Sequence, residues 1–414
     1  MLALNRSNGR SNLIERLDNE RSRCRAVQSA RLGEQALEDV TVDEKSTAGF
    51  AYLFYATSDA YACSALVNIK RIRRDYHSTL AVHVLVSEEV TSHYITAFEG
   101  EGAFVHLHEI PRPSLHANDT SWADNEYYRN CLLKLVAFQM HRISPGLNRI
   151  LALDADQLIL RNLDELFTGL PTVDLAAPRA YWLSKDFIAS TFLLINLSDH
   201  LWDVVSNAIA SAAQDRYDMD IVNDVFGKKV MMLTGEFVTL NSHWEDWNLP
   251  DWFYTSEMDA IDWDEVDSIN AAIRVRSSPD RRDRPLGNEV SAGQSWTSKD
   301  LIEDFVPSAV SAGLPVMDHA SSGAETPRNT GKPSPLDPQQ NKTLSPRFPH
   351  DHPLTRSLYD LLQKSAVMHF TAVSKPWIVD AEETQRARPD AHPLLMEVIR
   401  IWQEDATSIC LFPI

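Results

Sequence analysis

Two aspartates separated by one residue offer the clearest candidate chemistry in this sequence. Asp154 and Asp156 follow a short apolar run that begins at Ile150, and such a run predicts a strand buried on both faces. Its C-terminal end is where α/β sheets place ligands. Side chains at i and i+2 of an extended chain share one side, about 6.6 Å apart, so both carboxylates can reach one cation.

Paired carboxylates repel each other unless positive charge lies between them. The D-x-D spacing therefore favours a divalent cation that bridges both acids to a diphosphate, and hard oxygen ligands suit Mg²⁺ or Mn²⁺. The alternative interpretation is an acidic strand end that is exposed to solvent.

Three further groups of charged side chains have both a chemical and a structural interpretation. Asp218 and Asp220 precede an apolar helix, where carboxylates cap the helix and interact favourably with its dipole. Lys134 lies in an apolar helix at residues 130–140, and such a lysine usually reaches solvent. Because this helix leads directly into the acidic strand, Lys134 can instead face a nucleotide. His369 and Lys375 also fit an ordinary strand end and a surface lysine.

The elements predicted around these residues alternate between strands and helices. Strands are expected at residues 50–57, 79–86, 103–110, 149–160, 174–177 and 190–196. This alternation predicts an α/β fold with a mostly parallel central sheet flanked by helices. No G-x-G-x-x-G or Walker pattern is present, so NAD and P-loop chemistry are disfavoured.

Composition limits the possible partners. The chain has 414 residues, of which 44% are hydrophobic, and a formal net charge of -19. This acidic balance argues against nucleic acid as a partner, because no basic excess exists to neutralise phosphates. The four cysteines are widely spaced and form no C-x-x-C pair, so neither a zinc site nor a disulfide framework is indicated. The cysteines therefore do not distinguish an oxidising compartment from a reducing one.

Changes in composition divide the chain into four parts. We expect a flexible or peripheral helical tail at residues 1–48, a catalytic domain at 49–274, a disordered insertion at 275–355 and the rest of the catalytic domain at 356–414. His352 falls within the expected insertion and is predicted to be solvated. No run approaches the roughly 18 apolar residues of a membrane span. As written the chain is expected to be cytoplasmic, and a Golgi location would require a membrane anchor missing from this sequence.

Four separated motifs share one family pattern. They are Tyr55-Ala56-Thr57-Ser58-Asp59-Ala60-Tyr61, Leu153-Asp154-Ala155-Asp156 with Asp164-Glu165-Leu166-Phe167, Asp218-Met219-Asp220, and His369-Phe370-x-x-x-x-Lys375-Pro376-Trp377. In this order they resemble glycosyltransferase family eight, the glycogenin-like group with a GT-A fold. Within that family the opening segment looks closest to the fungal N-acetylglucosaminyltransferases.

The resemblance implies a hexosyltransferase with a UDP-sugar donor and a metal cofactor. Asp154, Asp156 and His369 would bind Mn²⁺, since adding an imidazole to two carboxylates moves preference from Mg²⁺ toward Mn²⁺. The residues implied to hold the donor are Tyr55, Thr57 and Tyr61 for uridine, the backbone of Ala155 for ribose, Lys134 for the nucleotide-sugar and Lys375 for the diphosphate. Asp220, with Asp218, would orient the donor sugar or stabilise an oxocarbenium-like centre. The family also implies retention of anomeric configuration.

Departures from the family pattern leave the sugar and the acceptor open. Ala189-Ser190-Thr191 stands where glycogenin-like members have Asn-Ser-Gly, and Ala372 replaces a glycine near the phosphates. The donated sugar is expected to be glucose or N-acetylglucosamine. No self-glucosylated tyrosine can be located, so the acceptor is expected to be an external glycan or glycoprotein. Aromatics alternate with acids at residues 244–253, which suits a sugar ring but also an ordinary core.

Two other classes of protein compete with this interpretation. A phosphatase of the haloacid-dehalogenase type also places D-x-D at a strand end, but its first aspartate lies near the start of the domain, whereas about 100 folded residues precede Asp154 here. The second is a non-catalytic protein that binds a glycan or nucleotide on the same fold.

Overall fold

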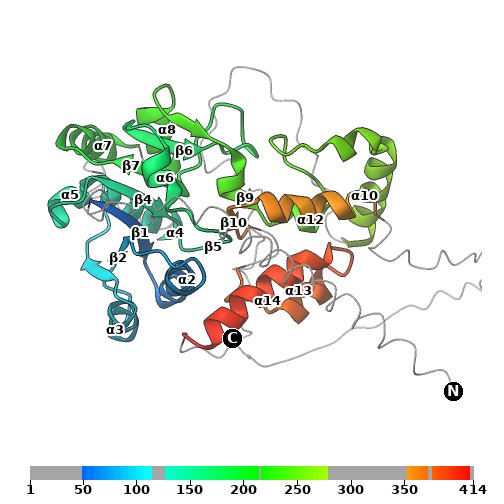
Figure 1. The fold of residues 1–414 in the computed structure, drawn as a ribbon, viewed down its shortest axis with the longest axis horizontal. Helices are drawn as coiled ribbons and strands as arrows, with labels where there is room; N and C mark the ends of the chain where they lie inside the picture. Colours follow the sequence, from blue (N-terminus) through cyan, green and yellow to red (C-terminus); the bar gives the residue numbers. More distant parts are fainter. Residues whose placement is uncertain (1–48, 114–125, 214–215, 278–351, 372–374, 411–414) are drawn as a thin grey trace, which may run out of the picture. The chain divides into compact units, whose positions relative to one another are not determined.

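A seven-stranded sheet forms the centre of the described chain (Figure 1). The computed structural model describes residues 49–113, 126–213, 216–277, 352–371 and 375–410. In the order β3-β2-β1-β4-β7-β6-β8, the strands are Phe104–Leu107, Ala81–Val86, Phe50–Ala56, Arg149–Leu153, Phe192–Asn196, Leu175–Pro178 and Met231–Leu233. Strand β7 runs antiparallel to β4 and β6, and the other pairings are parallel. The predicted α/β fold with a mostly parallel sheet is confirmed.

The two faces of this sheet bury two separate sets of apolar side chains. Successive residues of a strand point to opposite faces. In β4, Leu151 and Leu153 join one core cluster while Ile150 and Ala152 join the other. All five residues of β4 are buried, as expected for a strand covered on both faces.

Helices connect and cover the strands. In the described residues they are α2 (Asp59–Lys70), α3 (Ser92–Gly100), α4 (Glu126–Cys131), α5 (Met140–Ile143), α6 (Glu165–Gly169), α7 (Asp199–Ser211), α8 (Asp218–Phe226), α9 (Ser242–Asp246), α10 (Trp263–Ser277), α12 (Thr355–Lys364), α13 (Ala381–Ala387) and α14 (Pro393–Thr407), with a π-helical turn η2 (Arg71–Asp75) and 3₁₀ segments η5 (Leu132–Gln139), η6 (Gly235–Val238) and η7 (Ser256–Ala260). The single helix expected at residues 130–140 is therefore wrong in detail, because η5 separates α4 from α5. Its residues from Leu132 to Phe138 are all buried, so tertiary packing decides this backbone conformation.

A second, three-stranded sheet brings distant parts of the chain together. It has the order β5-β10-β9, formed by Gln157–Ile159, Val367–His369 and Thr239–Leu240. The strand expected at residues 149–160 is thus two strands in two sheets, with the D-x-D turn between them. The reason is that β4 pairs with β7 whereas β5 pairs antiparallel with β10, which places His369 opposite Gln157.

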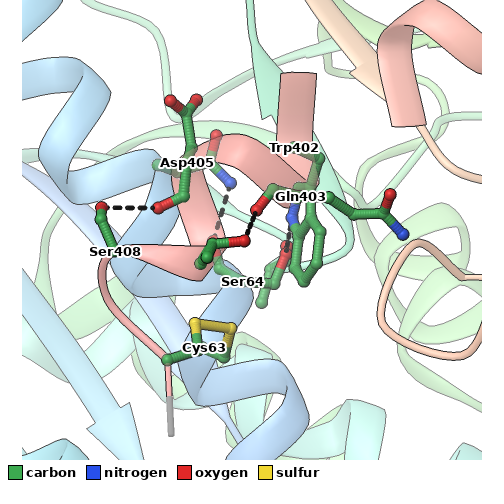
Figure 2. Close-up of a disulfide and its surroundings, with 10 residues drawn as sticks. Cys63, Ser64, Trp402, Gln403, Asp405 and Ser408 are labelled. Carbon is green, nitrogen blue, oxygen red and sulfur yellow. Dashed lines mark hydrogen bonds between the residues drawn. A yellow bond between two sulfur atoms is a disulfide. The ribbon is translucent and has the colours of Figure 1, made fainter. Parts of the chain in front are cut away.

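One disulfide corrects the expectation from cysteine spacing. Cys63 of α2 is bonded to Cys410, which follows α14, at a sequence separation of 347 (Figure 2). A pair so far apart leaves no local spacing pattern, so only folding reveals it. Cys131, also within the described residues, forms no disulfide.

The expected tail at residues 1–48, and residues 278–351 of the expected insertion, lie outside the described residues, whereas residues 275–277 end helix α10. His352 does not have the solvated position predicted for it, since it is 7% exposed. Its ring stacks on Trp247 with centroids 4.1 Å apart, and Nε2 lies 3.2 Å from Asn270 Oδ1. An indole face and an amide therefore bury this ring. Of the helices in the described chain, none combines the length and the apolarity needed to cross a membrane.

Candidate active site

The turn between β4 and β5 and the end of β10 bring together the three residues predicted as metal ligands. One ligand atom from each of Asp154, Asp156 and His369 lies within 4.8 Å of the others. His369 Nε2 is 3.4 Å from Asp156 Oδ1. Both carboxylates are buried, so they are not a solvated strand end.

The chemistry of these three side chains fits a divalent cation. Two carboxylates and one imidazole supply oxygen and nitrogen donors, which suit a divalent metal ion. His369 Nδ1 is buried and, among the described residues, has no hydrogen-bond partner. A buried polar atom without a partner costs free energy, which a bound ligand would recover.

Two lysines contact the carboxylates of this cluster. Lys134 Nζ lies 2.7 Å from both Asp154 Oδ1 and Asp218 Oδ2. Lys375 Nζ lies 2.7 Å from Asp156 Oδ2 and donates to the carbonyl of Phe370. Lys134 is 2% exposed, so it faces the acids rather than solvent. Positive charge therefore converges on the site from two elements far apart in sequence.

Burial and these charges move the pKa values of the two acids in opposite directions. Burial raises the pKa of Asp154 to about 6, against the opposing effect of Lys134. Burial also acts to raise the pKa of Asp156, but Lys375 and His369 outweigh it and hold that pKa below its usual range. For Lys134 the penalty of burial is outweighed by Asp154 and Asp218, which raise the pKa of this lysine. The lysine is therefore charged at neutral pH.

A cavity of about 120 Å³ opens beside the cluster. Most of the residues predicted from the sequence line it, namely Tyr55, Thr57, Tyr61, Lys134, Asp154, Asp156, Asp218 and His369. The Lys134 ammonium group also lies 5.5 Å from the centroid of the Tyr55 ring, a distance suited to a cation–π contact. The cavity lining therefore combines aromatic and charged side chains.

Further residues of the cavity were missed in the sequence. They are Asn130, Cys131, Ser190, Thr191, Tyr217 and Met219. Helical spacing offered a signal for the first two, since Asn130 and Cys131 precede Lys134 by one turn. Ser190 donates to Asp218 Oδ2 at 2.6 Å, a long-range contact that no local pattern indicates.

Three predicted site residues lie outside the cavity lining. Asp220 is buried and its carboxylate accepts a hydrogen bond from the Tyr217 amide at 3.1 Å, as a cap of α8. The Ala155 carbonyl accepts from the Ser64 hydroxyl. Lys375 approaches Asp156 without lining the cavity. Asp220 thus acts as a helix cap, which was one of the two interpretations of this pair, whereas Asp218 faces the cavity.

Curated relatives align with less than half of the chain. A protein of Gibberella zeae named glucose N-acetyltransferase 1 is 29% identical over 210 residues, which cover 45% of this chain and 44% of that protein. The protein of the same name from Aspergillus fumigatus is 26% identical, covering 45% and 54%. Glycogenin-1 of Caenorhabditis elegans is 27% identical, covering 42% and 39%. The chain resembles glycogenin-like glycosyltransferases. This confirms the resemblance to glycogenin and to fungal proteins, and the chain spans about half the length of these relatives.

No family model matches the chain. Among solved structures, the galactosyltransferase LgtC with donor and acceptor sugar analogues aligns at a TM-score of 0.42 and 13% identity, over 88% of this chain and 97% of that one. The glycosyltransferase GlyE of Streptococcus pneumoniae aligns at a TM-score of 0.33 and 16% identity, over 47% and 48%. Scores this low do not by themselves establish a shared fold.

Proposed function

We propose that this chain is a glycosyltransferase of the GT-A type that moves a hexose from a UDP-sugar to a glycan or glycoprotein acceptor. The observation that carries the proposal is the convergence of Asp154, Asp156 and His369 beside a lysine-lined cavity. These ligands come from segments more than 200 residues apart, and the motifs that contain them also carry the resemblance to glycogenin.

In this proposal Asp154, Asp156 and His369 hold Mn²⁺ or Mg²⁺. The cation, when bound, neutralises negative charge that develops on the departing nucleoside diphosphate. Lys134 and Lys375 bring two further positive charges to the same carboxylates, and they bind and orient the phosphates of the donor. A leaving group stabilised in this way needs no general acid.

The nucleoside end of the donor is assigned to the aromatic side chains of the cavity lining. Tyr55, Thr57 and Tyr61 line the cavity, and the ring of Tyr61 packs against Trp377 with centroids 5.1 Å apart. A flat base stacks well on such rings, and the backbone beside Ala155 is assigned to the ribose.

Asp218 is assigned to the donor sugar. Its carboxylate faces the cavity and is held by Lys134 at 2.7 Å and Ser190 at 2.6 Å. It can accept hydrogen bonds from sugar hydroxyls and stabilise positive charge at the anomeric carbon. Asp220 supports this arrangement by capping the helix that presents Asp218. Glucose or N-acetylglucosamine as donor sugar, and retention of configuration, complete the proposal.

Nucleotide binding and donor cleavage test this function together. Isothermal titration with UDP is expected to show binding that requires Mn²⁺, and a panel of UDP- and GDP-sugars is expected to release nucleotide with the metal present. Loss of an outer-shell partner of a metal costs about 10–100-fold, so Asp156→Asn, which changes a ligand, is expected to weaken Mn²⁺ binding by about 100-fold. The matched control is Asp203→Asn at an exposed aspartate of α7, with unchanged binding.

The rival classes give different results in the same experiments. UDP binding without turnover of any donor would favour a binding protein, and a covalent phosphate on Asp154 would favour the phosphatase. Failure of UDP to bind at any Mn²⁺ concentration would overturn the proposed function.

A further inference from the structure

We propose that three polar side chains on one face of α2 and η2 position the acidic turn of the metal cluster, and that the C-terminal helix α14 holds them in place. The three side chains are Ser64, Asn68 and Arg71, hereafter the α2 ladder. They lie four and three residues apart, so they share one helix face. The inference extends the function proposed above to residues that do not touch the donor.

The α2 ladder hydrogen-bonds one edge of the turn and of β5. The Ser64 hydroxyl donates to the carbonyl of Ala155 at 2.6 Å, between the two predicted metal ligands. Asn68 donates to the carbonyl of Gln157 at 2.7 Å and accepts from the amide of Ile159 at 2.9 Å. Arg71 Nε donates to the carbonyl of Ile159 at 2.9 Å. Three side chains thus take the role of a neighbouring strand.

The opposite edge of the same segment belongs to β10. Successive backbone groups of an extended chain point to alternate edges. Accordingly the Asp156 carbonyl accepts from Phe370 and the Leu160 amide donates to Ala366, whereas residues 155, 157 and 159 bond to the ladder. The ladder therefore fixes the register of β5 against the strand that carries His369. A shift by one residue would turn the carboxylates away from the imidazole.

Helix α14 anchors the ladder at both ends and through a covalent bond. Trp402 Nε1 donates to Ser64 Oγ at 3.1 Å, and both residues are fully buried (Figure 2). Arg71 pairs with Asp405 at 2.7 Å. The disulfide joins Cys63, the neighbour of Ser64, to Cys410 just beyond α14. Each contact spans more than 330 residues of sequence.

The same helix also contacts the segment that follows Lys375. Gln403 donates to the carbonyls of Pro376 and Val379, both at 3.1 Å. Because Lys375 bonds Asp156, α14 reaches the cluster from two sides: through the ladder, and through the chain that carries the lysine. The helix is thus placed to control the geometry of the cluster without contributing a ligand.

Metal affinity in the ladder variants tests this proposal. Ser64→Ala and Trp402→Phe are each expected to weaken Mn²⁺ binding about tenfold. The affinity is measured by titration at a temperature well below the thermal unfolding midpoint of each variant. The double variant Cys63→Ser with Cys410→Ser is expected to act in the same direction. The matched control is Val205→Ala on α7, which removes buried carbons in the other core cluster. It is expected to lower the thermal unfolding midpoint but to leave Mn²⁺ affinity unchanged.

A measurement without metal keeps the ladder separate from the proposed function. Ser64→Ala is expected to speed hydrogen exchange of amides at residues 154–160, whereas Val205→Ala leaves them unchanged. If the wild-type chain bound no Mn²⁺, the proposed function would fail and this measurement would still decide the role of the ladder. Unchanged exchange and unchanged Mn²⁺ affinity in Ser64→Ala, or equal losses in Val205→Ala, would overturn the inference.

Discussion

The two sheets of this protein are built in different ways. The seven-stranded sheet has strands of up to seven residues, and apolar side chains fill both of its faces. The three-stranded sheet has strands of two or three residues from three distant segments, and its edge strand β5 is completed by side chains of α2. Both sheets bury apolar side chains, and the second also depends on specific long-range hydrogen bonds.

The three proposed metal ligands lie where these two sheets meet. Asp154 follows β4 of the large sheet and Asp156 precedes β5 of the small one, while His369 ends β10. The large sheet therefore positions one proposed ligand, and a small sheet built from distant segments positions the other two. Substitutions in the two sheets should separate stability from metal binding.

The largest expected effect is on stability, from a core substitution in the large sheet. Ile195→Ala in β7 removes buried carbons and is expected to lower the free energy of unfolding by about 4 kcal/mol. The folded fraction should keep its Mn²⁺ affinity, because β7 supplies no ligand. Met368→Ala in β10 is the matched substitution in the small sheet, and it should reduce both the free energy of unfolding and Mn²⁺ affinity. Denaturant titration would measure the free energy of unfolding, and calorimetry would measure Mn²⁺ affinity. Equal Mn²⁺ affinities in the two variants would contradict the difference drawn between the two sheets.

The next effect is on metal binding alone. His369→Ala is expected to weaken Mn²⁺ binding by about 100-fold, on the scale of losses seen for changes around metal sites. The free energy of unfolding measured without metal should change by less than about 1 kcal/mol, since Lys375 still pairs with Asp156 when the imidazole is removed. His200→Ala on α7 is a control away from the cluster. A large loss of stability with no change in Mn²⁺ affinity would place His369 in the scaffold instead.

The smallest effect comes from pH and should appear in both regions. Burial lowers the pKa of His83 in β2, with help from His106, and burial lowers that of His243 beside β9, each to about 4. A folded-state pKa below the unfolded value of about 6.5 means that the unfolded chain binds more protons. The stability contribution of each histidine is then complete above pH 6.5 and is lost as pH falls toward 4.

Denaturant titrations between pH 7 and 4 test this pH dependence. His83→Asn should make the free energy of unfolding depend less steeply on pH, and His243→Asn should reduce this dependence by a similar amount. If neither variant changes this pH dependence, other titratable groups cause the loss of stability at low pH.

Much of the scaffold could be predicted because its signals are local. Apolar runs such as residues 149–153 become strands whichever partner they find, and polar breaks mark their ends. The convergence of Asp154, Asp156 and His369 was also predicted, although these residues are far apart in the sequence, because family motifs carry that information. The division of the predicted strand 149–160 was missed because both halves are equally apolar and only their pairing partners differ.

By itself the sequence determined the alternation of strands and helices, the D-x-D motif and the three side chains that converge there. Only the tertiary structure decided that Asp218 faces the cavity while Asp220 caps a helix, that His352 is buried, and that Cys63 meets Cys410. The physical reason is the range of the interactions. Strand patterns depend on neighbouring residues, whereas hydrogen bonds, ring stacking and disulfides between distant segments depend on how the folded chain packs.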